Sequence, residues 1–349
     1  MINILKEHLA TYPNMEIQDV AKLLFQSEFG GGHMIADAEK SFKRIQEEYT
    51  SLKSDVPGEP PLTESIGNGI SRIYLSSLSR GLRPEILNEM FVRSAENSKG
   101  TFEGLESKIH QFLQACQNHV LPFNEPDARD FFGKWKKQGY PAISHSDTYR
   151  KSYHPAYRVV ETCYAKACEA ICMIQALQER PFLVAIDGMS GGGKSTLGAL
   201  VHKNFPESNL FHMDDYFLQP HQRTQERLSE IGGNVDYERF KGEIISHLND
   251  KEGLDYQPYD CCTQSLEAAI HVPWKPIVII EGSYSQHPYF EDIYDLKIFC
   301  EISAEEQKQR IIQRNGEMMW KRFEGEWIPK ENAYFSKFQI KKNNMIMQR

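Results

Sequence analysis

The 349-residue sequence has no paired cysteine motif, no long apolar run and no excess of positive charge. Its seven cysteines include no C-x-x-C pair, which argues against a structural zinc site and favours reduced thiols in a cytosolic protein. No stretch reaches the length of a membrane span or resembles a signal peptide, so we expect a cytoplasmic protein that does not contact a membrane. The formal net charge of −8 argues against a nucleic-acid partner bound through phosphate neutralisation.

The chain is long enough for two domains, and its pattern changes near residue 178. Residues 1–178 favour a mainly helical domain of unknown role. Pro155 is expected to open a long helix from Ala156 to about residue 177, which would lead into the second domain. The segment 70–75 fits either a short strand or a helical turn, and its periodicity does not decide between them. The clearest amphipathic helical stretches are 17–25, 84–94, 105–116 and 127–137.

Residues 179–349 alternate between apolar runs and helical patterns. This alternation predicts an α/β domain, a parallel sheet covered by helices on both faces and joined by right-handed crossovers. In such sheets ligands bind at the carboxyl ends of the strands. The apolar runs are 182–186, 209–213, 276–280 and 296–302, and helical patterns cover 237–248 and 304–314.

A glycine-rich segment directly follows the first of these runs and fits G-x-x-x-x-G-K-[ST]. Glycines let backbone N–H groups turn toward phosphate oxygens, and the helix that follows adds the positive end of its dipole. This order of strand, loop and helix predicts a P-loop that binds ATP and Mg²⁺, with Lys194 on the β- and γ-phosphates and the Ser195 hydroxyl on the metal. The predicted cofactor-binding residues are Gly188, Met189, Ser190, Gly191, Gly192, Gly193, Lys194, Ser195 and Thr196.

Acidic residues follow two further strands of the predicted sheet. Asp214 and Asp215 come after the run at 209–213, and Glu281 comes after the run at 276–280. Phosphoryl transfer to an alcohol needs carboxylates to order Mg²⁺ and to accept the hydroxyl proton. We therefore expect Asp215 and Glu281 to act with Ser195 as metal ligands. The alternative is that the aspartates form a solvated turn and that Glu281 caps the next element.

Four segments together resemble a known family. AIDGMSGGGKST, HMDDYF, PYDCCTQS and IIEGSYS are similar to motifs of the uridine kinase and phosphoribulokinase group of P-loop kinases. The resemblance covers roughly residues 180 to 340 and implies a P-loop NTPase fold with kinase activity for that half. It implies that Asp214 deprotonates the acceptor hydroxyl.

The same resemblance implies substrate-binding and charge-stabilising residues. Asp236 in Asn-Val-Asp-Tyr matches an acidic segment near the acceptor, and Tyr259 lies in a segment that helps to hold the nucleoside in uridine kinases. The His and Arg of that nucleoside segment are Gln264 and Leu266 here. The arginine-rich lid of the family resembles Arg310 and Arg314, which would act as catalytic residues, with Arg322 as an addition. The alternative is that Arg310 and Arg314, four residues apart on one helix face, form surface salt bridges.

These features predict an ATP-dependent kinase that transfers the γ-phosphoryl of MgATP to the hydroxyl of a small-molecule substrate, in the manner of uridine kinases. The alternative is an ATP-regulated switch or scaffold in which the P-loop domain controls the helical domain. The helical half could also be a second enzyme. A homo-oligomer stays open, since no sequence feature decides the oligomeric state.

Three histidines of the first half could converge on a metal or an anionic substrate. They are His33, His145 and His154, with Glu28 near His33 in sequence. Their spacing matches no metal-binding template, and hydrogen-bonded or exposed histidines are the alternative.

Overall fold

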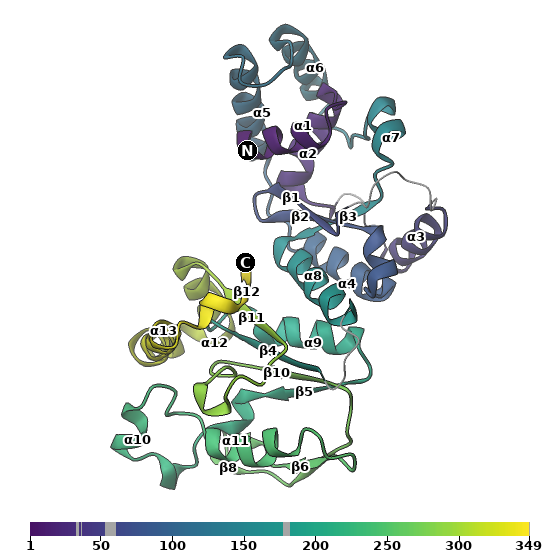
Figure 1. Ribbon diagram of the computed structural model, residues 1–349. Coiled ribbons are helices and arrows are strands. Elements are labelled where there is room, and N and C mark those ends of the chain that lie inside the picture. The colour runs from purple at the N-terminus through teal and green to yellow at the C-terminus, as the bar shows by residue number, and fades with distance from the viewer. Residues whose placement is uncertain (33–34, 36, 53–60, 177–181, 349) are drawn as a thin grey trace. The chain divides into compact units, whose positions relative to one another are not determined.

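The computed structural model describes residues 1–32, 35, 37–52, 61–176 and 182–348. The chain forms two compact units, residues 1–173 and residues 174–349 (Figure 1). The predicted boundary between residues 178 and 179 lies outside the described residues. Across the described ranges, no helix is long and apolar enough to cross a membrane.

The first unit combines helices with a small antiparallel sheet, in which β2 lies between β1 and β3 (Figure 1). Its hydrophobic core is formed by buried side chains from helices and strands, among them Leu24, Phe112 and Trp135. The helices are α1 (Ile2–Thr11), α2 (Ile17–Phe29), α3 (Ala38–Thr50), α4 (Pro84–Glu96), α5 (Phe102–Gln117), α6 (Glu125–Lys137), α7 (Asp147–Tyr153) and α8 (Thr162–Ala176), and the strands are β1 (Thr63–Gly67), β2 (Ile70–Tyr74) and β3 (Tyr157–Glu161).

The sheet of the first unit corrects one prediction and resolves another. The long helix expected from Ala156 is wrong, because Tyr157–Glu161 forms β3 and helix α8 begins only at Thr162. Strand β3 pairs along its length with β2 in an antiparallel register that sets Val159 opposite Arg72. Tyr157, Val159 and Val160 are residue types that favour a half-buried strand. Their pairing with β2 outweighs the tendency of Pro155 to begin a helix. The segment at 70–75, which the sequence left open, forms strand β2 as far as Tyr74 and then enters a 3-10 helix at Leu75.

The second unit is built on a five-stranded parallel sheet with the order β12-β11-β4-β10-β5. The α/β prediction for this half is confirmed. The strands of this sheet are β4 (Phe182–Gly188), β5 (Ser208–His212), β10 (Ile277–Glu281), β11 (Leu296–Glu301) and β12 (Met345–Gln348), with β6 (Leu254–Tyr256) paired to β9 (Ile270–Val272) and β7 (Tyr259–Asp260) to β8 (Ser265–Leu266) outside it. The helices are α9 (Lys194–Asn204), α10 (Gln225–Ser229), α11 (Tyr237–Glu243), α12 (Ala304–Arg322) and α13 (Ile328–Lys337).

Helices cover both faces of this sheet. Side chains alternate between the faces of a strand, so Val278 and Ile280 of β10 lie on one face, where they pack with α11 and α13. Helix α9 packs against β4, β5 and β10. In the parallel register Glu281 lies beside His212 of β5 and Ile186 of β4. The carboxyl ends of these three strands therefore meet at one edge, where the glycine loop also begins.

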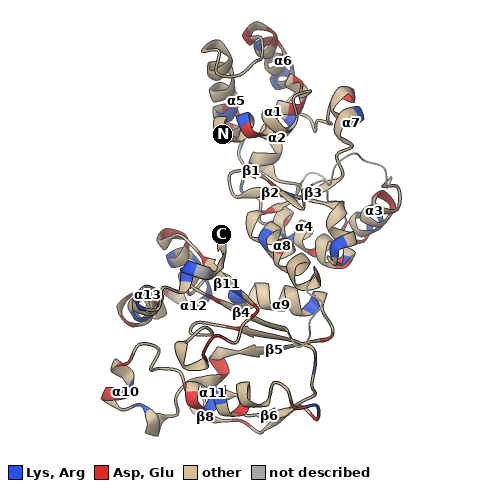
Figure 2. Ribbon diagram, viewed as in Figure 1, with Lys and Arg blue, Asp and Glu red and all other residues tan. Residues whose placement is uncertain are grey.

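Lysine and arginine residues alternate with aspartate and glutamate residues along the ribbon of both units (Figure 2). Many of them pair within one helix, such as Arg44 with Glu48 in α3 and Arg129 with Glu125 in α6. Exposed pairs of this kind add only a few tenths of a kcal/mol each, about 0.3–0.5. These exposed pairs therefore contribute little to the stability of either unit.

Candidate active site

The glycine loop joins the central strand β4 to helix α9. Gly188 ends β4 with φ +138°, and a Cβ atom added there would lie 2.3 Å from the Cys300 carbonyl oxygen of β11. Both the backbone conformation and the close approach of the neighbouring strand therefore require glycine. Gly191 and Gly193 also have positive φ, and α9 begins at the next residue, Lys194. The loop thus turns immediately before a helix N-terminus, the position where backbone N–H groups favour a phosphate.

Lys194 lies folded over the glycine loop. Its Nζ donates hydrogen bonds to the Gly188 carbonyl oxygen at 2.8 Å and to the Met189 carbonyl oxygen at 3.2 Å. These bonds hold the ammonium beside the loop and at the start of α9, where its charge adds to the positive end of the helix dipole. The loop therefore concentrates positive charge where the sequence predicts phosphate binding.

Glu331 of helix α13 fastens the glycine loop from the other side. Its buried carboxylate accepts hydrogen bonds from the Ser190 backbone N–H at 3.0 Å and from the Ser190 hydroxyl at 2.6 Å. It also accepts one from the Ser283 hydroxyl at 2.7 Å, just after strand β10. The sequence analysis missed this residue because it belongs to no motif and lies 141 residues from Ser190.

We expect Glu331→Gln to destabilise the second unit by about 1–3 kcal/mol, since an amide offers one oxygen acceptor where the carboxylate accepts three hydrogen bonds. Chemical unfolding followed by circular dichroism measures the change. Glu324→Gln, at an exposed position shortly before α13, is the matched control and should change stability little. Equal stability of the two variants would show that the carboxylate does not hold the loop.

A cavity of about 560 Å³ opens over the loop and the carboxyl ends of the strands. Its apolar wall includes Phe217, Phe323 and Trp327, while its polar wall combines side chains from several separate segments of the chain. A cavity of this size accommodates a small-molecule ligand. Of the residues predicted from the sequence, it brings together Ser190, Gly191, Gly193, Lys194, Ser195, Thr196, Asp214, Glu281, Arg310 and Arg314.

Asp214 lies in a short turn after strand β5 and faces this cavity. Its side chain is open to the cavity, but the surrounding protein removes much of its hydration and raises its pKa above the usual value. The positive charge of Lys194 opposes that shift, whereas the carboxylate of Glu281 adds to it. A carboxylate with a raised pKa is a stronger proton acceptor, as a general base requires.

Glu281 ends strand β10 and pairs with His212 of the neighbouring strand. The Nδ1 atom of His212 lies 2.6 Å from Glu281 Oε1, and this hydrogen bond raises the pKa of His212 more than burial lowers it. The imidazolium form is therefore favoured while Glu281 is ionised. Because Glu281 is buried, the protonated form of His212 would compensate the charge of its carboxylate.

We expect Glu281→Gln to lower the pKa of His212 toward its usual value of 6.5. The neutral amide cannot stabilise the protonated His212 ring as the carboxylate does. The ring is still buried in the variant, and burial favours its neutral form. A nuclear magnetic resonance titration of the His212 ring measures this shift. Glu207→Gln, an exposed substitution in the same unit, serves as control. An unchanged titration in Glu281→Gln would contradict the pairing.

The two predicted lid arginines line the cavity from helix α12. Arg310 donates to the Gly191 carbonyl oxygen at 3.2 Å and pairs with Glu306, and Arg314 donates to Asn315 at 2.7 Å. Arg310 is therefore held against the glycine loop, and both side chains line the cavity from α12. Gly316, with φ +82° and ψ 165°, interrupts the helix just after Arg314. Arg322 is absent from the described lining and stacks on Trp327.

Six predicted residues are not among the described residues that line the cavity: Gly188, Met189 and Gly192 of the glycine loop, and Asp215, Asp236 and Tyr259. Asp236 is buried at the start of α11, where its side chain accepts hydrogen bonds from Arg239 N at 3.0 Å and Gln222 Nε2 at 2.8 Å. The Tyr259 hydroxyl accepts one from Arg223 at 2.6 Å. These contacts give Asp236 and Tyr259 structural roles, and their substrate roles stay predictions, as does a metal role for Asp215.

The donor set of the cavity fits Mg²⁺ with nucleotide phosphates better than a metal held by protein alone. Among the residues that the structure describes, no three His, Cys, Asp or Glu side chains converge on one point. Mg²⁺ is commonly held by one or two carboxylates together with phosphates and waters. Ser195, Asp214 and Glu281 offer such oxygens in one cavity beside Lys194.

Curated uridine kinases match part of this chain. A uridine kinase of Oceanobacillus iheyensis is 28% identical over 150 residues, which are 39% of this chain and 67% of that protein. A uridine kinase of Clostridium botulinum is 30% identical over 146 residues, 39% of this chain and 68% of that protein. The chain belongs to the uridine kinase family.

The remaining comparisons add no narrower assignment to this uridine kinase family member. A solved structure of a possible uridine kinase from Bacillus stearothermophilus is 19% identical, with a TM-score of 0.41, over 53% of this chain and 98% of that one. No family model matches the sequence. The family relationship thus rests on the curated relatives, and these matches leave most of the chain uncovered.

Proposed function

We propose that this chain is a phosphotransferase that moves the γ-phosphoryl group of MgATP to the hydroxyl of a small molecule. The observation that carries this proposal is the convergence of Lys194, Asp214 and Arg314 on one cavity over the glycine loop. Phosphoryl transfer depends mainly on positioning and on stabilising charge, and a cavity with these groups offers both. The kinase names of the curated relatives support the same reaction.

Each group has a role in this proposal. Lys194 and the loop N–H groups bind the phosphates, and Arg310 and Arg314 stabilise negative charge on the transferring group. The Asp214 carboxylate accepts the hydroxyl proton of the substrate as its oxygen attacks phosphorus. Mg²⁺, when bound near Ser195 and Glu281, would neutralise charge on the β- and γ-phosphate oxygens.

The acceptor is a small hydroxyl compound of the nucleoside or sugar type, on the side of the cavity near Asp214. Phe217, Val235 and Cys261 line the same cavity and provide a surface for the apolar face of such a compound. Uridine itself is the first candidate because the curated relatives carry that name. The replacement of the family's His and Arg by Gln264 and Leu266 makes a changed acceptor preference the second candidate.

The test is release of ADP from MgATP in the presence of single acceptors: uridine, cytidine, pentose phosphates, pantothenate and amino alcohols. We expect one compound class to stimulate release by the wild-type protein but not by Asp214→Asn. A switch or scaffold that only binds ATP needs no proton acceptor for an alcohol. Release that no acceptor stimulates, together with intact ATP binding, would overturn the kinase proposal in favour of that alternative.

A further inference from the structure

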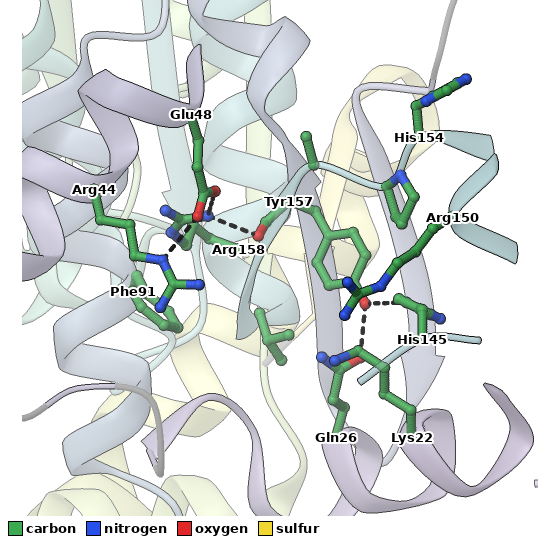
Figure 3. A pocket seen from close by; sticks show the side chains of 13 residues that line it. Lys22, Gln26, Arg44, Glu48, Phe91, His145, Arg150, His154, Tyr157 and Arg158 are labelled. Atoms are coloured by element: carbon green, nitrogen blue, oxygen red, sulfur yellow. Dashed lines mark hydrogen bonds and ion pairs between the residues drawn. The ribbon is translucent and has the colours of Figure 1, made fainter. Parts of the chain in front are cut away.

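The first unit contains a cavity of its own, of about 360 Å³, between helices α2, α3 and α4 and strand β3 (Figure 3). It brings together His145 and His154, two of the three histidines that the sequence left unassigned, while His33 lies outside the described residues. His154 has a left-handed backbone with φ +44°, an uncommon conformation for a residue other than glycine. The proposed phosphotransferase reaction uses none of these residues.

At one end of this cavity, two arginines form ion pairs with the same glutamate. Arg158 donates to Glu48 Oε2 at 2.7 Å, and Arg44 donates to Glu48 Oε1 at 2.8 Å. Figure 3 shows both guanidinium groups on the same carboxylate, beside the ring of Phe91. Two cations share one anion here, so this end keeps a net positive charge.

The other end of the cavity holds Lys22 and Arg150 (Figure 3). Lys22 Nζ donates to the Ile143 carbonyl oxygen at 3.0 Å, and burial, with the charges of Arg72 and Arg150, lowers its pKa to about 8. Within the described residues no carboxylate lies at ion-pair distance from Lys22 or Arg150. These two cations therefore have no ion-pair partner within the described residues.

The nearby Asp19 does not supply that partner. Its buried carboxylate accepts hydrogen bonds from the His145 ring at 2.8 Å and from the Ser146 N–H and hydroxyl at 3.0 and 2.7 Å. Burial lowers the pKa of His145 to about 4, so the ring is neutral near pH 7. Its Nδ1–H then donates to Asp19, and its Nε2 accepts from the Tyr157 hydroxyl at 2.6 Å. This chain of hydrogen bonds fixes the wall of the cavity, and the Asp19 carboxylate, whose charge raises the pKa of Lys22, is not among the described residues that line the cavity.

The lining thus carries four cationic side chains against one carboxylate, in a protein whose net charge is −8. A phosphate monoester carries about −1.5 to −2 charge near pH 7 and accepts several hydrogen bonds from lysine and arginine. The cavity is larger than a phosphate group, and Phe91, Pro155 and Val159 give it an apolar wall. We propose that this cavity binds a small phosphorylated metabolite, with the phosphate at Lys22 and Arg150 and the organic part toward Phe91.

This proposal does not depend on the proposed kinase function. The ligand class is also that of a kinase product, so the experiment must separate binding here from binding at the glycine loop. The full chain carrying Lys194→Ala serves this purpose, because that substitution removes the central phosphate-binding charge of the loop.

Calorimetric titration of the Lys194→Ala protein uses ribose 5-phosphate, glycerol 3-phosphate and uridine 5′-monophosphate as probes. Orthophosphate, malate and ribose represent phosphate alone, a carboxylate dianion and an uncharged sugar. Lys22→Gln and Arg150→Gln are then added singly to the same background. Lys151→Gln removes one exposed charge from the same helix as Arg150 and is the matched control.

We expect at least one monoester to bind, and to bind more tightly than orthophosphate, malate or ribose. Lys22→Gln and Arg150→Gln should each weaken that binding by roughly tenfold, since each removes a charged hydrogen-bond donor. Lys151→Gln should leave it unchanged. Binding that Lys22→Gln and Arg150→Gln do not affect, binding of malate as tight as that of the monoester, or no binding by any monoester would each overturn the proposal.

Discussion

Replacing Lys194 with alanine is expected to lower the rate of phosphoryl transfer by about 10²–10³-fold, the usual cost of removing one charge-stabilising donor. The ammonium lies folded on the loop through the Gly188 and Met189 carbonyl oxygens, where it can reach bound phosphate. Those two bonds are the only hydrogen bonds of the Lys194 side chain within the described residues. The substitution should therefore lower the free energy of unfolding by only about 1 kcal/mol. Steady-state kinetics and chemical unfolding measure the two effects separately.

Lys203→Ala is the control for this prediction, because it removes an exposed lysine from the other end of helix α9. It should leave turnover close to that of the wild-type protein. If Lys194→Ala and Lys203→Ala had equal turnover, the glycine loop would not be the site of transfer. If Lys194→Ala were unfolded, its lost activity would say nothing of charge, and for this reason the unfolding measurement accompanies the kinetics.

Asp214→Asn should reduce transfer by about 10²–10⁴-fold, the usual contribution of a general base, while the affinity for ATP changes little. The amide keeps the size of the carboxylate but cannot accept the hydroxyl proton. The substitution also removes one negative charge from the cavity, and this loss should not weaken the binding of an anionic nucleotide. Calorimetric titration with ATP, together with single-turnover kinetics, separates binding from transfer.

Asp255→Asn is the matched control, since Asp255 is exposed on strand β6 and lies outside the cavity lining. The wild-type transfer rate should also fall as the pH is lowered through the pKa of Asp214, because protonation removes the base. That pKa lies above the ordinary value for an aspartate, so the fall should begin at a correspondingly higher pH. Full transfer activity in Asp214→Asn would remove Asp214 from the mechanism.

The glycine loop and the parallel sheet could be predicted because their signals are local. The motif from Gly188 to Ser195 lies between an apolar run and a helical pattern, and each piece is readable within a few residues. Asp214 and Glu281 could be placed together because the carboxyl ends of parallel strands share one edge. In the structure, the register of β10 against β5 sets Glu281 beside His212, two residues before Asp214, as this rule predicts.

Other parts of the fold and site depend on contacts between distant segments. Glu331 meets the loop only because α13 packs on the sheet, and no spacing in the sequence connects it with Ser190. Strand β3 contradicts the predicted helix because its pairing with β2 is long-range, whereas Pro155 is a local helix signal. The cationic cavity of the first unit likewise joins Lys22 to Arg150, which lie on different helices far apart in the chain.

The measurement that tests the central claim most directly follows the γ-phosphoryl group itself. The wild-type protein and Asp214→Asn are incubated with Mg²⁺, ATP labelled in the γ-phosphate and pooled nucleosides, pentose phosphates, pantothenate and amino alcohols, and the labelled products are separated. We predict label in an organic phosphate ester with the wild-type protein and almost none with Asp214→Asn, although both bind ATP. Label that stays in ATP or appears only as orthophosphate, equally for both proteins, would contradict the account.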